Sequence, residues 1–140
     1  MGLLFLVTWS SNLRKGLYGA EFAPFVQGWA DGTAITLYRD FLERVVIPNA
    51  TLFSTVQLVM EFLVMGVFLV VGFVTPLSAL VAAGFSLNLL LASYGTGEWP
   101  GTYLLMLAIL VAVAVGQAGR VLGVDAYLAR RNARPRLPLY

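Results

Sequence analysis

The sequence contains no cysteine and no histidine. Without cysteine, the chain has no disulfide, no CxxC redox motif and no thiolate chemistry. Without histidine, it lacks the common haem and transition-metal ligand and the usual acid or base near neutral pH. These absences argue against electron transfer carried out by this chain alone, and they predict no metal site in it.

Charged residues are also scarce, at 11% of the 140 residues, whereas hydrophobic residues make up 59% and the mean hydropathy is +0.83. This balance exceeds the apolar share of a typical soluble domain. We therefore expect a membrane protein formed by a single domain over residues 1–140.

The longest apolar stretch covers residues 49–74 and reads NATLFSTVQLVMEFLVMGVFLVVGFV. About twenty apolar residues cross the hydrocarbon core as a helix, which satisfies its own backbone hydrogen bonds. The stretch predicts a span over residues 50–74 with one ionisable group, Glu61, near mid-depth. A carboxylate there costs about 2.5–3.5 kcal/mol on insertion scales and usually faces a bundle interior or a cavity.

Two further spans are predicted, over residues 76–92 and 103–119. Only a short turn before Pro76 separates the first of them from the preceding span, so these two form an antiparallel hairpin. Both carry small residues at helical spacing, which let helices approach closely in lipid. The expected helix-packing residues are Ala82, Ala83, Ser86, Ala108, Ala112 and Gly116.

Residues 1–15 predict a short first helix, because their apolar part of roughly ten residues cannot cross a bilayer at about 1.5 Å per residue. It is either a half-helix supported by its neighbours or a helix shortened by a start codon assigned too late. No basic n-region or small-residue cleavage site marks a signal peptide. The expected fold class is thus an all-α, four-helix transmembrane bundle with a short first helix.

Residues 18–47 are less hydrophobic and predict an amphipathic external loop on the membrane surface. Phe22, Phe25, Val26 and Trp29 fall at helical spacing, and a second short helix follows Thr33. Its expected apolar face consists of Ile35, Tyr38, Phe41, Leu42 and Val45, and its expected ion pairs are Arg39–Glu43 and Asp40–Arg44. Pro48 is expected to end this helix.

Five of the nine basic residues lie at or after Arg120, in a tail over residues 120–140. The positive-inside rule then predicts a multi-pass protein of the plasma membrane with a cytoplasmic C-terminus, although four basic residues in the outside region dilute the rule. Beside a membrane span, the tail arginines fit contact with anionic lipid and not with nucleic acid. Val124, Tyr127 and Leu128 favour a short helix on the membrane surface.

The polar side chains expected inside the membrane are few, and the candidate site consists of Gln57, Glu61, Asn88 and Lys15. Gln57 and Glu61 lie four residues apart on one helical face. A protonated Glu61 would bond to Gln57 or Asn88, and a charged one would need Arg14 or Lys15. Glu61 is either a proton-accepting, quinone-facing carboxylate or a polar staple between the first two helices.

The ordered motifs of the chain resemble the DoxX/DoxD family of small four-helix membrane proteins. The matching segments are the run after Ile47, SLNLLLA, a Trp-containing loop, YLLMLA and AGRVLGVDAYLARR. Glu61, Gly66 and Gly72 match the family's second helix, whereas Pro76 replaces an arginine of that pattern. The resemblance implies a membrane subunit of a thiosulfate:quinone oxidoreductase-like complex, with quinone and lipid as its ligands and other subunits as its partners.

Three functions remain open at this point. The first is a quinone-adjacent subunit of an oxidoreductase complex, near Glu61, with redox cofactors on partner chains and none in this chain. The second is a structural accessory subunit of a larger membrane complex. The third is a small-molecule carrier in which Glu61 couples to protons. At most, the chain is a cofactor-free part of an enzyme.

Overall fold

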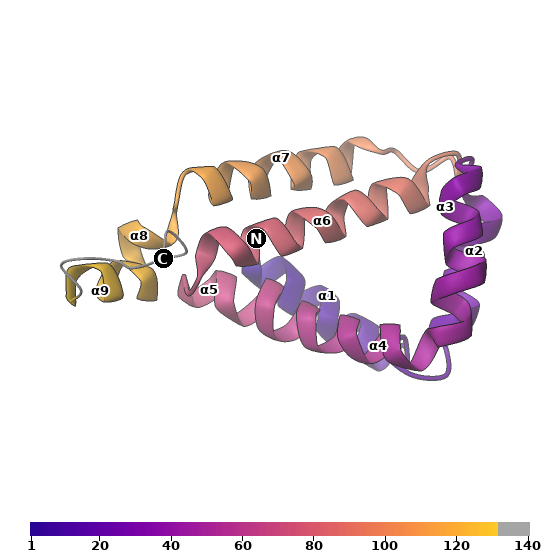
Figure 1. Ribbon diagram of the computed structural model, residues 1–140, viewed down its shortest axis with the longest axis horizontal. Helices are drawn as coiled ribbons and strands as arrows, with labels where there is room; N and C mark the ends of the chain where they lie inside the picture. The colour runs from indigo at the N-terminus through magenta and orange to yellow at the C-terminus, as the bar shows by residue number, and fades with distance from the viewer. Residues whose placement is uncertain (132–140) are drawn as a thin grey trace.

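The computed structural model describes residues 1–131, and of Leu122 only the backbone. The described residues form helices and no strand, as the sequence predicts (Figure 1). The α-helices are α1 (Gly2–Arg14), α2 (Phe22–Gly32), α3 (Thr36–Phe41), α4 (Ala50–Val59), α5 (Leu69–Val71), α6 (Thr75–Ser93), α7 (Gly101–Val115), α8 (Gly119–Leu122) and α9 (Val124–Arg131).

Three helices are long and apolar enough to cross a membrane: Thr36–Val71, Thr75–Ser93 and Gly101–Val121. Helix α1 is not among them, since its 13 residues extend for only about 20 Å. It packs antiparallel to the second half of the first long helix, where Gly66 makes room for Leu6.

The long helix Thr36–Val71 passes through Pro48, so the expectation that Pro48 ends the preceding helix is wrong. The proline lies in a 3₁₀ turn, Ile47–Asn49, and it bends the helix without ending it, because it lacks a backbone N–H and its ring crowds the preceding turn. The chain changes direction sharply between α3 and α4 there (Figure 1). Two segments of the long helix are π-helical, η1 (Leu42–Val46) and η3 (Met60–Phe68).

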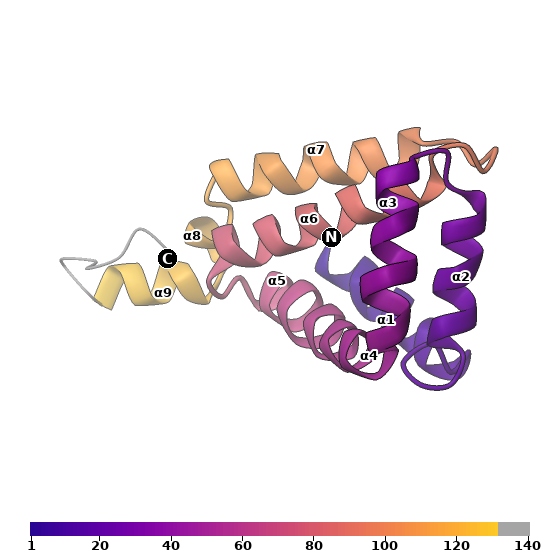
Figure 2. The same ribbon diagram turned by 45° about the vertical axis from the view of Figure 1, so that its right-hand side comes forward.

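The long helix and α6 meet at a tight turn and diverge from it like the arms of a V (Figure 1). Gly72 adopts φ +68° and Val74 φ +45° in this turn, and glycine reaches such values without strain. Helices α2 and α3 stand across the open end of the V, and α8 and α9 lie at the opposite end (Figure 2).

Helix α7 packs along α6 through large side chains on one helix and small ones on the other. The predicted small residues Ala82, Ala83 and Ser86 of α6 are buried, and Leu110 of α7 packs against the two alanines.

The small residues Ala108, Ala112 and Gly116 lie on an exposed face of α7. They were expected to pack against a neighbouring helix, and within this chain that prediction is wrong. The face of α6 that meets α7 already consists of small residues. Small residues on α7 as well would leave voids between the two helices, and Leu110 fills this space instead.

Helix α9 is tied to the turn of the V by Asp125, which is fully buried. Its carboxylate accepts from the backbone N–H groups of Val74 (2.7 Å) and Thr75 (2.8 Å), at the N-terminus of α6. Such an acceptor satisfies N–H groups that have no partner within the helix. The glycine-rich sequence before Asp125 allows the approach, because a Cβ on Gly123 would stand 2.7 Å from the Gly72 Cα.

The segment predicted as an amphipathic loop forms α2, α3 and η1, whose apolar faces build one core cluster. The buried residues of its second helix are Tyr38, Leu42 and Val46, whereas Phe41 and Val45 are exposed, contrary to the prediction. These three buried residues recur every four residues, and the buried face follows this spacing because the helix continues from α3 into the π-helical segment η1.

The Asp40–Arg44 pair predicted in this segment is present at 3.9 Å. Arg39 does not join Glu43 as predicted. Its guanidinium instead donates to the backbone oxygens of Ala30 (2.9 Å) and Thr33 (2.8 Å), where α2 leaves carbonyl groups unpaired.

Candidate functional site

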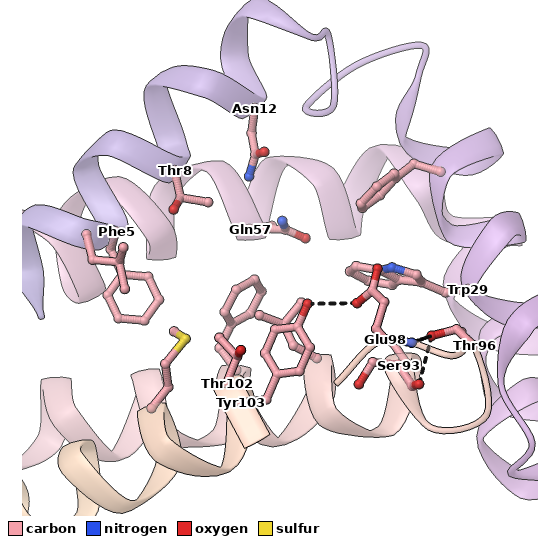
Figure 3. Close-up of a pocket in the computed structure, with 16 residues that line it drawn as sticks. Phe5, Thr8, Asn12, Trp29, Gln57, Ser93, Thr96, Glu98, Thr102 and Tyr103 are labelled. Carbon is pink, nitrogen blue, oxygen red and sulfur yellow. Dashed lines mark hydrogen bonds between the residues drawn. The ribbon is translucent and has the colours of Figure 1, made fainter. Parts of the chain in front are cut away.

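A cavity of about 400 Å³ lies between the arms of the V, and we call it the first cavity. Its walls come from α1, α2, α4, α6, α7 and the loop between α6 and α7 (Figure 3). The volume falls in the range of small-molecule sites, which are concave, mostly apolar and fitted with a few polar groups.

Two amide side chains point into the first cavity from one side, Asn12 of α1 and Gln57 of α4 (Figure 3). Tyr103 of α7 faces them, and its hydroxyl donates to Glu98 Oε2 at 3.3 Å. Glu98 and Trp29 lie toward one end of the cavity. These groups supply hydrogen-bond donors and acceptors to a ligand held between opposite walls.

Aromatic rings form much of the remaining wall. The rings of Phe25 and Trp29 of α2 contact each other at a tilt of 57°, with centroids 4.7 Å apart, and Phe85 of α6 also lines the cavity. Such rings favour a flat, weakly polar ligand, since offset and edge-on ring contacts are both attractive.

Glu61 lies behind the two amide side chains, Asn12 and Gln57. It is fully buried and does not line the first cavity. Its carboxylate accepts from Tyr18 (2.6 Å), Asn12 (3.3 and 3.4 Å) and Gln57 (3.5 Å). Glu61 therefore restrains the two amides that enter the cavity. It belongs to the π-helical segment η3, and π-helical turns are frequent at functional sites.

The predicted contact between Gln57 and Glu61 is present, and the other predicted partners of Glu61 are not. Arg14 and Lys15 are exposed, and the three groups that donate to Glu61 are uncharged. Lys15 does not line the first cavity. Neutral donors replace the expected cation because α1 presents Asn12 to Glu61 while the chain turns Lys15 away.

Asn88 is not a partner of Glu61 either. Its side-chain oxygen accepts from the Tyr38 hydroxyl at 2.9 Å, which ties α6 to α3. Asn88 belongs to the half of α6 that is farther from the turn, and α6 diverges from the long helix with distance from that turn (Figure 1).

Tyr18, in the loop after α1, was missed by sequence reasoning. Its pKa is raised above the ordinary value, first by burial and then by the hydrogen bond to Glu61 and the charge of that carboxylate. The hydroxyl therefore keeps its proton and remains the donor of the 2.6 Å bond.

The cavity residues Asn12, Trp29, Glu98 and Tyr103 were also absent from the predicted site. They come from four separate segments, and no spacing in the sequence connects them. The only available signal was the clustering of aromatic residues in α2 and in the α6–α7 loop.

A family model described as the TQO small subunit DoxD matches residues 24–136. The chain belongs to the DoxD family. The match covers Gln57, Glu61 and the turn around Gly72, whereas all of α1, with Asn12, precedes it. No curated protein and no solved structure matches the chain. Membership of the DoxD family and the three long apolar helices together indicate a membrane protein.

Proposed function

We propose that the chain is an integral membrane subunit of a quinone-linked oxidoreductase complex and that it binds quinone in the first cavity. The observation that carries this proposal is the cavity itself. It combines aromatic walls with amide and phenol groups, among helices apolar enough to span a membrane. The family description, small subunit of TQO, supports the same assignment.

A quinone headgroup suits this cavity on chemical grounds. It is a flat ring with two carbonyl oxygens on opposite edges, and each oxygen accepts hydrogen bonds. Asn12 and Gln57 each donate to Glu61, and an amide NH2 carries two hydrogens, so each would offer its second N–H from one wall. From the other wall, the Tyr103 hydroxyl would turn its one O–H from Glu98 to the quinone oxygen. The rings of Phe25, Trp29 and Phe85 would contact the ring faces.

In this proposal, partner chains supply the electrons and hold the redox cofactors. The chain's own side chains include no cysteine or histidine. Its contribution is to bind, orient and shield the quinone. Glu61 acts as a positioning residue, because it holds Asn12 and Gln57 and does not itself line the cavity.

We further propose that α1 completes a four-helix bundle as a half-length helix. We also propose that the protein lies in the plasma membrane and that its C-terminus is on the cytoplasmic side. The basic residues at and after Arg120 support this orientation by the positive-inside rule. Membrane lipid and other subunits of the complex are the remaining partners.

Binding of a short-chain benzoquinone to the protein in lipid nanodiscs tests the proposal. Gln57→Leu removes an amide donor from the cavity at similar volume, and we expect Kd to rise about tenfold, the effect of one hydrogen bond. Thr55→Val is the matched control, because Thr55 is exposed on the same helix and bonds only to Thr51. Equal Kd values for both variants and the unchanged protein would contradict the proposal.

A structural accessory subunit is the second candidate, and the Glu61 cluster favours it. Hydrogen bonds from Asn12 and Tyr18 fasten α1 and the loop after it to η3, as a purely structural staple would. Glu61→Gln separates the two functions. Loss of quinone turnover in an intact complex supports the first, and loss of assembly supports the second. Quinone-independent transport of a solute into liposomes would instead indicate a carrier.

A further inference from the structure

A second cavity of about 320 Å³ is lined by α2, α3, η1, α4, η3 and α6. Trp29, Gln57 and Phe85 line both cavities. The two cavities are therefore adjacent, and these three side chains, Gln57 among them, lie where they meet.

The second cavity differs from the first in chemistry. Apart from Gln57 and Asn88, its lining consists of Trp29 and apolar side chains, among them Val46, Phe53 and Met65. The Asn88 oxygen is already bonded to Tyr38. Hydrocarbon is the ligand chemistry that such walls accommodate, since polar ligand atoms would lose their hydrogen bonds to water there.

The second cavity also reaches the outer surface of the long apolar helix. Phe41, Val56 and Met60 line it and remain 43%, 45% and 39% exposed. Val56 and Met60 follow the bend at Pro48, in the long helix Thr36–Val71 that is able to span a membrane, so the surface they form would face lipid chains. A ligand that fills the second cavity can thus extend into the bilayer.

We infer that the two cavities form one site for a tailed amphiphile, with a quinone headgroup in the first cavity and its isoprenoid tail in the second. This inference rests on the proposed function and adds the place in the fold where the tail of the quinone is held. Gln57 would stand where the headgroup meets the tail. The site is then loaded sideways from the membrane.

Two probes and two matched variants test the inference. The probes are a benzoquinone without a tail and the same benzoquinone with a decyl tail, both bound to protein in nanodiscs of one lipid composition. Val56→Trp fills the second cavity from its exposed rim. Val59→Trp is the control, because Val59 is 44% exposed on the same helix and lines neither cavity. Partition into lipid cancels in each ratio of variant to unchanged protein.

We expect Val56→Trp to weaken binding of the decyl probe by about tenfold, roughly the effect of losing contact with two methylene groups. Binding of the tail-less probe should change less than about twofold, which also shows that the variant is folded. Val59→Trp should change neither. An equal effect of Val56→Trp on both probes, or no effect on either, would overturn the two-cavity site. Failure of both probes to bind the unchanged protein would instead overturn the quinone site itself.

Discussion

Glu61 is buried in a helix of a membrane protein, and its hydrogen bonds come from three residues, two of which are distant in the sequence. Asn12 precedes it by 49 residues and Tyr18 by 43, while Gln57 lies one helical turn away. A carboxylate at membrane depth is costly unless it is paired or bonded. The cluster meets this requirement with neutral donors and at the same time fixes two amides at the edge of the first cavity.

The raised pKa of Tyr18 predicts a specific loss of stability at alkaline pH. In the unfolded chain, a tyrosine ionises near pH 10, whereas folded Tyr18 keeps its proton to higher pH. Above pH ~10 the folded state therefore binds more protons than the unfolded chain, so the free energy of unfolding falls as pH rises. The stabilisation is fully present below pH ~10.

Thermal unfolding in mild detergent across the alkaline range measures this effect. Tyr18→Phe should lower Tm below pH ~10, because the bond to Glu61 is lost, and should show a shallower decline above it. Tyr94→Phe, at an exposed loop tyrosine, is the control and should follow the unchanged protein. A Tyr18→Phe variant whose Tm declines as steeply as that of the unchanged protein would show that Tyr18 does not supply this linkage.

At the residue scale, the sequence predicted Gln57 and Glu61 as neighbours because a helical repeat connects them. It also indicated that Glu61 would face inward, because burial of a charge in lipid demands it. It could not predict Asn12 or Tyr18, since their approach depends on how α1 packs against η3. The expected cation, Arg14 or Lys15, was wrong for the same reason: one turn of α1 decides which side chain meets Glu61.

At the scale of elements, the turn of the V depends on close backbone contact between Gly72 and Gly123. Gly123→Ala should lower the free energy of unfolding by about 1–3 kcal/mol, because the added Cβ would meet the Gly72 Cα at 2.7 Å. Gly84→Ala is the control, as no atom lies within 4 Å of its added Cβ. It should be neutral or stabilising by about 0.5–1 kcal/mol in a helix interior.

Chemical denaturation of both glycine variants in the same detergent gives the comparison. Equal stabilities would mean that the α8–α9 segment does not pack against the turn as described. Retained stability of Gly123→Ala together with a destabilised Gly84→Ala would contradict the account at both positions.

The limits of sequence reasoning at this scale concern where helices end and which face packs. The span over residues 76–92 was predicted closely as Thr75–Ser93, because a long apolar run flanked by a turn has few alternatives. Pro48 was misread, since proline in a 3₁₀ turn does not stop a helix. The small-residue face of α7 was misassigned because spacing shows that a face exists but not what it meets.

At the scale of the whole molecule, the proposed orientation makes a direct prediction for labelling. The chain has no cysteine, so single introduced cysteines report without background. In right-side-out membrane vesicles, an impermeant maleimide should label Tyr94→Cys, in the α6–α7 loop, but not Arg130→Cys, near the end of α9. Inverted vesicles should give the opposite result. Labelling of Arg130→Cys in the right-side-out vesicles would reverse the topology.

The two cavities are properties of the whole molecule and could not be predicted from the sequence. They exist because the arms of the V diverge and α2 and α3 close the open end (Figure 2). The divergence depends on the turn at Gly72, and the position of α3 across the open end depends on the bend at Pro48. The sequence shows each residue but not the angle it produces. The membrane class and the helical fold follow from composition, whereas the candidate site follows only from packing.

The central claim, a quinone held in the first cavity, is tested most directly by the quinone content of the protein purified from its native membrane. Mild detergent extraction followed by mass spectrometry gives the amount of quinone per chain and identifies any partner chains. The account predicts about one isoprenoid quinone per chain in the unchanged protein, a clear loss in Gln57→Leu, and retention in Thr55→Val. Equal quinone content in all three proteins would contradict it. So would the absence of quinone from an unchanged protein that is purified with its partner chains.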